Sequence, residues 1–141
     1  MIRVFPGMKV IQFAFDSREE SDYLPHNYEK NCVVYTGTHD NDTLCGWYKV
    51  LDPDDLKLSQ KYMNNANTPK RQIHWDFIRL ALASVADLCI IPLQDYLGLG
   101  SEARINTPST LGNNWRWRMT QGCLTKELAD QIRELTTLYG R

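Results

Sequence analysis

The sequence predicts an α/β fold in which helices cover a parallel sheet. Three short apolar runs have the near-continuous hydrophobic composition of strands that are buried on both faces of such a sheet. Segments with helix-start signals and an apolar stripe lie between the second run and the third. Polar and ionisable residues follow each run, at the end of the strand where barrels of alternating strands and helices carry their active sites.

Each predicted strand leads into polar residues that include an aspartate. The runs and the residues that follow them are 9–15 before Asp16, 32–36 before Thr38-His39-Asp40-Asn41-Asp42, and 88–93 before Gln94-Asp95. Pro92 cannot donate a hydrogen bond to a strand ladder, so we expect it near the end of its strand or at a bulge.

The helices are predicted from caps and periodicity. Asp52-Pro53 and Thr68-Pro69 each place a capping residue before a proline at the first helical position. His74 lies in the second of these helices and is expected to be an ordinary helix residue. The apolar stripe of that helix comprises Ile73, Phe77, Ile78, Ala81, Leu82 and Val85. The stripe of a final helix, stopped near Gly140, comprises Leu128, Ile132, Leu135 and Leu138.

Three strands do not close a barrel. Parallel strands joined by right-handed crossovers form a barrel of about 250 residues, and this chain has 141. Residues 1–141 are therefore predicted to be the last portion of a larger domain. Unpaired strand edges in such a portion favour aggregation or marginal folding.

Composition excludes several classes of protein. A hydrophobic fraction of 43% and a charged fraction of 23% are those of a soluble globular protein. A net charge of -1 offers no attraction to nucleic acid, and no apolar run approaches the length of a membrane helix. The spacing of the four cysteines predicts buried reduced thiols and a cytoplasmic location. They are Cys32, Cys45, Cys89 and Cys123.

The cluster 38–42 has two interpretations. In one, Asp40 or Asp42 caps a helix that begins near Thr43. In the other, His39 and Asp40 hold a substrate hydroxyl and place a negative charge beside a developing cation. A metal-dependent hydrolase centred on the same pair is a further hypothesis, although no second histidine-rich cluster offers completing ligands.

Two other motifs have a structural and a functional interpretation. The glycines of 98–103 fit a relaxed dinucleotide fingerprint, but Pro108 follows where a helix is needed, and a flexible loop is the better interpretation. Trp115-Arg116-Trp117-Arg118 is expected to pack a barrel against its last helix, with a sugar-stacking platform as the functional alternative. The same two interpretations apply to Trp47.

Several segments together resemble the amylomaltases, which are the 4-alpha-glucanotransferases or disproportionating enzymes of glycoside hydrolase family 77. The segments are 6–15, 35–43 and 92–108, and Asn114-Trp115-Arg116-Trp117-Arg118 is similar to the closing motif of the family. The resemblance spans nearly the whole chain in the right order.

The resemblance implies a catalytic (β/α)8 TIM barrel of which this chain is the C-terminal part, holding about the last three strands. Family members transfer segments of α-1,4-glucan to the 4-hydroxyl of glucose or a maltooligosaccharide by a retaining mechanism, which requires a carboxylate nucleophile and an acid/base. Both are expected upstream of this chain, so the isolated chain is predicted to be inactive. A separately encoded partner that completes the barrel is another possibility.

Residue roles follow from the same resemblance. Asp40 corresponds to a third carboxylate that stabilises the transition state, and His39 is expected to bind the same sugar. Asn41 is expected to support them, Asn106 is a weaker candidate for contacting glucan, and Asp95 is expected to brace its loop. We expect no metal, cofactor, nucleic acid or membrane partner. The alternative function is a non-catalytic glucan-binding module using Trp47, Trp115 and Trp117.

Overall fold

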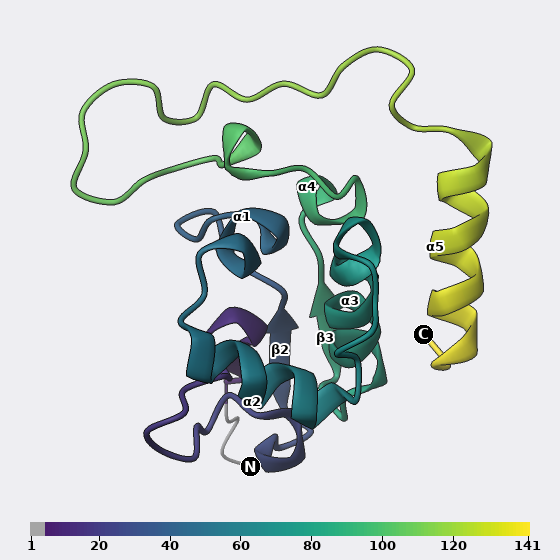
Figure 1. Ribbon diagram of the computed structural model, residues 1–141. Coiled ribbons are helices and arrows are strands. Elements are labelled where there is room, and N and C mark those ends of the chain that lie inside the picture. The colour runs from purple at the N-terminus through teal and green to yellow at the C-terminus, as the bar shows by residue number, and fades with distance from the viewer. Residues whose placement is uncertain (1–4) are drawn as a thin grey trace.

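The computed structural model describes residues 5–141 and has a parallel α/β architecture (Figure 1). In these residues one sheet contains β1 (Gly7–Val10), β2 (Cys32–Tyr35) and β3 (Leu88–Ile90), in that order. Both neighbouring pairs run parallel, and Val34 is in register with Lys9 on one side and with Cys89 on the other. The predicted α/β class with a parallel sheet is confirmed.

The helices precede and follow β3. They are α1 (Leu44–Lys49), α2 (Pro53–Met63), α3 (Ile73–Ala83), α4 (Leu93–Tyr96) and α5 (Lys126–Leu138). Short 3-10 helices cover Ile11–Phe13, Pro25–Asn27, Lys70–Gln72 and Ser101–Ala103. Within residues 5–141, no helix combines the length and the apolar character that crossing a membrane requires.

All three strands end before the predicted apolar runs do, β2 by a single residue at Tyr35. β1 ends at Val10, and Ile11–Phe13 form a 3-10 helix whose Ile11 is fully buried. The apolar composition of 9–15 therefore reflects a helical turn packed on the core as well as a strand. β3 ends at Ile90, and Pro92 stands at the N-cap of α4. The placement of Pro92 near the strand end is confirmed.

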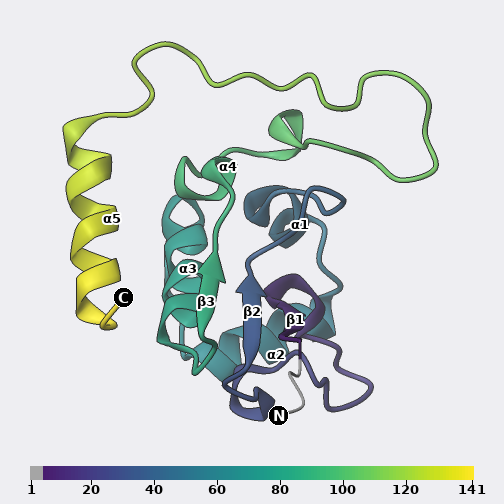
Figure 2. The same cartoon turned by 180° about the vertical axis from the view of Figure 1, so that it is seen from behind.

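The prediction that all three strands are buried on both faces was wrong. Cys32 and Val34 of β2 are buried, but Leu88 and Ile90 of β3 are 52% and 41% exposed. In Figures 1 and 2 the helices α2 and α3 lie on one side of the sheet, and Figure 2 shows the strands from the side that they leave open. One face of this sheet is thus only partly covered by the described residues.

Phe77 of α3 is at the centre of the core and fully buried. Its ring meets those of Phe15, Trp47 and Tyr48 edge-on, with centroids 5.9, 5.3 and 5.8 Å away. Such edge-to-face pairs add to the energy of apolar burial. The interpretation of Trp47 as a packing residue is confirmed, because its ring lies against this core and is only half exposed.

The helices differ from prediction mainly at their ends. The side chain of Asp52 accepts a hydrogen bond from Asp54 N–H, which confirms the start of α2. Lys70–Gln72 form a 3-10 turn, so α3 begins later than Thr68-Pro69 predicted. Val85 lies beyond the end of α3 and is 57% exposed, so its place in the apolar stripe was wrong.

α5 lies beside α3, after a long segment that arches over the ends of the strands (Figure 1). Leu135 is buried against the core, but Leu138 is 63% exposed, contrary to the predicted stripe. The guanidinium of Arg141 donates hydrogen bonds to the carbonyls of Leu82, Ser84 and Ala86. These bonds fasten the end of α5 to the turn between α3 and β3.

His74 is a buried residue of α3 that lies against Gly98, which has a φ of 65°. A side chain at position 98 would collide with the imidazole.

Among the described residues Cys32 is buried, the other three cysteines are half-buried, and all four are free thiols. The predicted burial was therefore right only for Cys32.

Asp95 of α4 ties the sheet to α1. It is 2% exposed, and its carboxylate accepts hydrogen bonds from the Thr36 hydroxyl at 2.6 Å and from Leu44 N–H at 2.9 Å. Asp95 is a brace, as predicted, although it braces the end of β2 and the start of α1 rather than its own loop.

The buried position of Asp95 makes stability depend on pH. Burial raises the pKa of Asp95 from 3.8 to about 6, although the two hydrogen bonds act in the opposite direction. The native state therefore holds this proton to higher pH than the unfolded chain does, and stability falls as pH rises between these values. Asp95→Asn keeps an acceptor for Leu44 N–H and removes the titration.

Between pH 4 and pH 7 we expect the unfolding free energy of the wild type to fall by about 2 kcal/mol relative to that of Asp95→Asn. Urea titrations of both proteins across this range measure the difference, in which the contributions of other carboxylates cancel. Parallel pH profiles would show that Asp95 titrates alike in the folded and unfolded states.

Candidate active site

Residues that follow all three strands meet at the carboxyl edge of the sheet, as expected for parallel strands. Gln12, after β1, donates a side-chain hydrogen bond to the carbonyl of Asp42 at 2.7 Å. Ser101, after β3, donates to the carboxylate of Asp42 at 2.6 Å. The polar segment after β2 is therefore held from both sides.

The segment 38–42 forms a compact turn. The side-chain oxygen of Asn41 accepts from the N–H and the hydroxyl of Thr38, at 2.8 and 2.9 Å. Thr43 is the N-cap of α1, because its hydroxyl accepts from Gly46 N–H at 3.1 Å. The interpretation of Asp40 or Asp42 as that cap was wrong. The side-chain bonds of Asn41 are to Thr38, within the same turn as His39 and Asp40.

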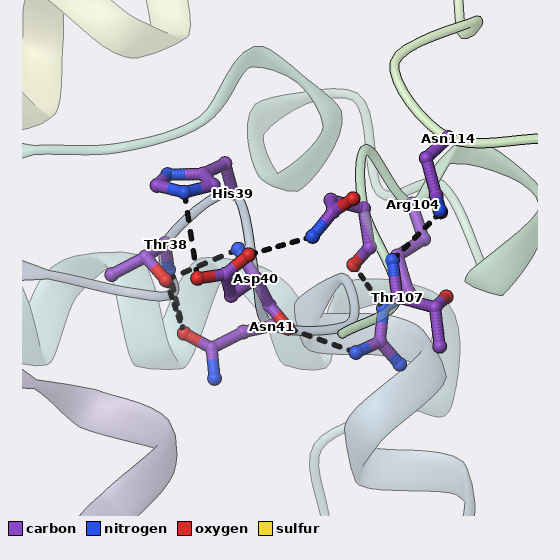
Figure 3. Close-up of polar contacts among 8 residues, drawn as sticks. Thr38, His39, Asp40, Asn41, Arg104, Thr107 and Asn114 are labelled. Carbon is purple, nitrogen blue, oxygen red and sulfur yellow. Dashed lines mark hydrogen bonds and ion pairs between the residues drawn. The ribbon is translucent and has the colours of Figure 1, made fainter. Parts of the chain in front are cut away.

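The carboxylate of Asp40 is half-exposed and lies between His39 and the loop that follows β3 (Figure 3). One oxygen accepts a hydrogen bond from the side-chain amide of Asn106 at 2.8 Å. The other lies 3.4 Å from Nε2 of His39. The structure thus brings together three of the predicted residues, His39, Asp40 and Asn106.

The loop after β3 is bound to the same turn through the backbone. Arg104 donates from Nε to the carbonyl of Asn106 at 2.9 Å and from Nη2 to the carbonyl of Asp40 at 2.8 Å. Asn106 N–H donates to the carbonyl of His39 at 3.1 Å. Figure 3 shows the two Arg104 bonds, together with the bond from Thr107 N–H to Asn114 that closes the base of the next loop.

Trp115 lies against His39, with ring centroids 5.2 Å apart and planes inclined by 35°. Its indole is 60% exposed, so the prediction that it packs within the protein was wrong for the described residues. The backbone of Trp115 has a φ of 60°, which non-glycine residues seldom adopt. A hydrogen bond from its N–H to the carbonyl of Ile105, at 2.7 Å, holds this conformation.

The arrangement suits a neutral, hydroxyl-rich ligand. The site offers hydrogen-bond acceptors and donors, namely the Asp40 carboxylate with one largely free oxygen, the His39 imidazole and the Asn106 amide. The exposed indole of Trp115 offers an apolar face. No group of three or more His, Cys, Asp or Glu in residues 5–141 is placed to hold a metal ion. The described residues therefore offer no donor set for the metal-dependent hydrolase hypothesis.

The sequence model for 4-alpha-glucanotransferases matches residues 2–125 of this chain. The chain belongs to the 4-alpha-glucanotransferase family. The 4-alpha-glucanotransferase of Clostridium butyricum is 51% identical over 138 residues, which are 97% of this chain and 28% of that protein. The chloroplastic/amyloplastic 4-alpha-glucanotransferase of Arabidopsis thaliana is 47% identical over 139 residues, covering 96% of this chain and 24% of that protein.

The fold is also similar to that of part of a solved amylomaltase. An amylomaltase from Streptococcus agalactiae in complex with acarbose matches with a TM-score of 0.90 and 37% identity, over 97% of this chain and 28% of that one. This chain thus spans about a quarter of the length of the 4-alpha-glucanotransferases that it matches.

Sequence reasoning missed the residues that hold the site together. The apolar run 9–15 predicts a strand that includes Gln12, and nothing in segment 92–108 singles out Arg104. The contact of Trp115 with His39 joins positions that are far apart along the chain. The polar residue within an otherwise apolar run was the one local signal for Gln12.

Gly46 of α1 permits the close approach of Asp42 and Ser101. A Cβ atom at position 46 would overlap the Ser101 hydroxyl and the Asp42 carboxylate. Helix propensity alone predicts that Gly46→Ala stabilises by about 1 kcal/mol. We expect the overlap to reverse the sign and lower the unfolding free energy by about 1–3 kcal/mol, measured in urea.

Gly7→Ala is the matched control, because a Cβ there meets nothing within 4 Å. It should change the unfolding free energy by less than about 0.5 kcal/mol. A Gly46→Ala variant as stable as the wild type or more stable would show that this approach is looser than described.

Proposed function

We propose that this chain forms the C-terminal part of the (β/α)8 barrel of a 4-alpha-glucanotransferase and supplies its transition-state-stabilising carboxylate, Asp40. The observation that carries the proposal is the Asp40 carboxylate at the carboxyl edge of a parallel sheet, held by Asn106 and beside His39. In barrels of this type, that edge is where catalytic side chains gather.

Asp40 acts by hydrogen bonding to hydroxyls of the sugar at the bond to be cleaved. Only one of its oxygens receives a short hydrogen bond within the described residues, so the other is free to accept from the substrate. As the ring gains oxocarbenium character its hydroxyls become better donors, and the bonds to a carboxylate strengthen. Such differential binding lowers the barrier rather than merely holding the sugar.

His39 and Asn106 complete the sugar-binding group. His39 presents its half-exposed imidazole beside Asp40, and its ring lies against Trp115. The side-chain amide of Asn106 donates from its nitrogen to Asp40, and its side-chain oxygen can accept from a sugar hydroxyl. Asn41 contributes indirectly by fixing the turn through Thr38.

The sheet supports the place of this chain within a barrel. A parallel three-stranded sheet with one open face and exposed Leu88 and Ile90 is what the last strands of a barrel present without the others. The rest of the barrel is therefore the proposed partner, and it would bring the nucleophile and the acid/base of a retaining mechanism. The proposed substrates are α-1,4-glucans and maltooligosaccharides, and transfer requires that an acceptor sugar replace water.

The alternative is a glucan-binding module without catalysis. Trp115, exposed beside His39, supports it, whereas Trp47 lies against the core and is unsuited as a platform.

The cytoplasmic location remains a prediction, since the relative from Arabidopsis thaliana is chloroplastic or amyloplastic.

A chimera tests the catalytic role. In it this chain replaces the 138 matched residues of the Clostridium butyricum enzyme. We expect it to disproportionate maltotriose, releasing glucose and longer oligomers. Asp40→Asn should lower kcat by about a hundredfold to a thousandfold, because a transition-state contact is lost. Asp54→Asn, an exposed residue of α2, is the control. A folded chimera that keeps its activity with Asn at position 40 would contradict the role of Asp40.

The isolated chain is expected to bind sugar without turning it over. Incubation with maltotriose should yield no glucose, because the nucleophile and the acid/base are proposed to lie in the rest of the barrel. Titration with maltoheptaose should quench tryptophan fluorescence, and Trp115→Phe should reduce the change by more than half, since this indole is exposed at the site. Glucose release by the isolated chain would contradict the prediction that it is inactive.

A further inference from the structure

We propose that Arg104 is a positioning residue that fixes Asp40 and Asn106 relative to each other for the reaction. This rests on the proposed function of Asp40. The guanidinium binds one carbonyl from each side of the site, that of Asp40 at 2.8 Å and that of Asn106 at 2.9 Å. It belongs to the loop after β3 but reaches the turn after β2, 64 positions away along the chain.

The two bonds suit arginine in particular. The guanidinium is planar, and its Nε–H and Nη–H groups have fixed relative directions, so one side chain holds two acceptors in fixed relative positions. Hydrogen bonds from a charged donor are about twice as strong as neutral ones. A lysine offers a single nitrogen on a flexible stem and reproduces at most part of this geometry.

The residues that precede Arg104 are themselves held in place. Ala103 is fully buried, and its carbonyl accepts a hydrogen bond from the side chain of Gln94 at 3.2 Å. Ser101 is held by Asp42 on the other side of the 3-10 helix Ser101–Ala103. The backbone that carries Arg104 is therefore fixed, and its guanidinium reaches from there to the two carbonyls.

Between the two loops, Arg104 completes a closed set of contacts. Asn106 N–H donates to the carbonyl of His39, and the Asn106 amide donates to the Asp40 carboxylate. Both bonds require the distance between residues 39–40 and residues 104–106 to stay constant. The guanidinium of Arg104 bridges these two segments. Without it, the carboxylate and the amide would still be present but free to drift apart, and small misplacements of catalytic groups cost up to about a hundredfold in rate.

A first experiment measures the two loops in the 141-residue chain. Hydrogen exchange followed by NMR reports the Asn106 amide, which is bonded to His39. We expect Arg104→Ala to speed its exchange by about tenfold or more and Arg104→Lys to have an intermediate effect, with amides of α3 unchanged. Arg133→Ala, an exposed arginine of α5, is the charge-matched control. Exchange at Asn106 that is the same in Arg104→Ala and wild type would overturn the proposal.

A second experiment measures turnover in the chimera. Arg104→Ala should lower kcat for maltotriose by about tenfold to a hundredfold with a smaller change in KM, and Arg104→Lys should recover part of the loss. Combined with Asn106→Ala, it should lower kcat by less than the product of the two single effects, because both act on the same contact. Single effects that multiply, or an unchanged kcat, would overturn the proposal.

The two proposals fail in different ways. If Asp40→Asn leaves the chimera active, the role of Asp40 is wrong whatever Arg104 does. If Asp40→Asn abolishes activity and Arg104→Ala leaves kcat unchanged, only the positioning role is wrong. A fall in melting temperature without a change in kcat would assign Arg104 a purely structural part.

Discussion

The buried carboxylate of Asp95 is the contact on which the arrangement of the site depends. The ladder of β2 ends at Tyr35, so backbone pairing no longer fixes the chain beyond that point. Asp95 takes over by accepting from the Thr36 hydroxyl and from Leu44 N–H, at either end of the segment that carries His39 and Asp40. Breaking either bond would leave a buried polar group unpaired, which costs about 1–3 kcal/mol or more for a charge.

Beyond the Asp95 contacts the site is exposed to solvent, yet its polar groups are held in place by hydrogen bonds between segments. Gln12, Ser101 and Arg104 each bind the segment after β2 from a neighbouring strand end. Because the side chains of Asp40 and His39 are about half exposed, they remain available to a ligand. Under the proposed function the ligand of these residues is a sugar, and the hydrogen-bonded base explains how a single carboxylate is kept ready for it.

The sequence predicted what local rules determine. The missing N–H of Pro92 and the cap at Asp52 act within a few residues, and both predictions held. The end of β1 was predicted wrongly because an apolar run does not distinguish a strand from a helical turn packed on the core. Contacts such as Arg104 with Asp40 join positions far apart along the chain, and the exposure of Leu88 depends on what covers the sheet. Neither can be deduced from one sequence.

The central claim is that Asp40, His39 and Asn106 bind one sugar unit while Arg104 holds their two loops together. A crystal structure of the chimera with bound acarbose tests this most directly. We expect the Asp40 carboxylate to accept hydrogen bonds from ring hydroxyls of one unit that also contacts His39 and Asn106, with both Arg104 bonds intact. Acarbose bound away from Asp40, or the two loops separated with the sugar in place, would contradict the account.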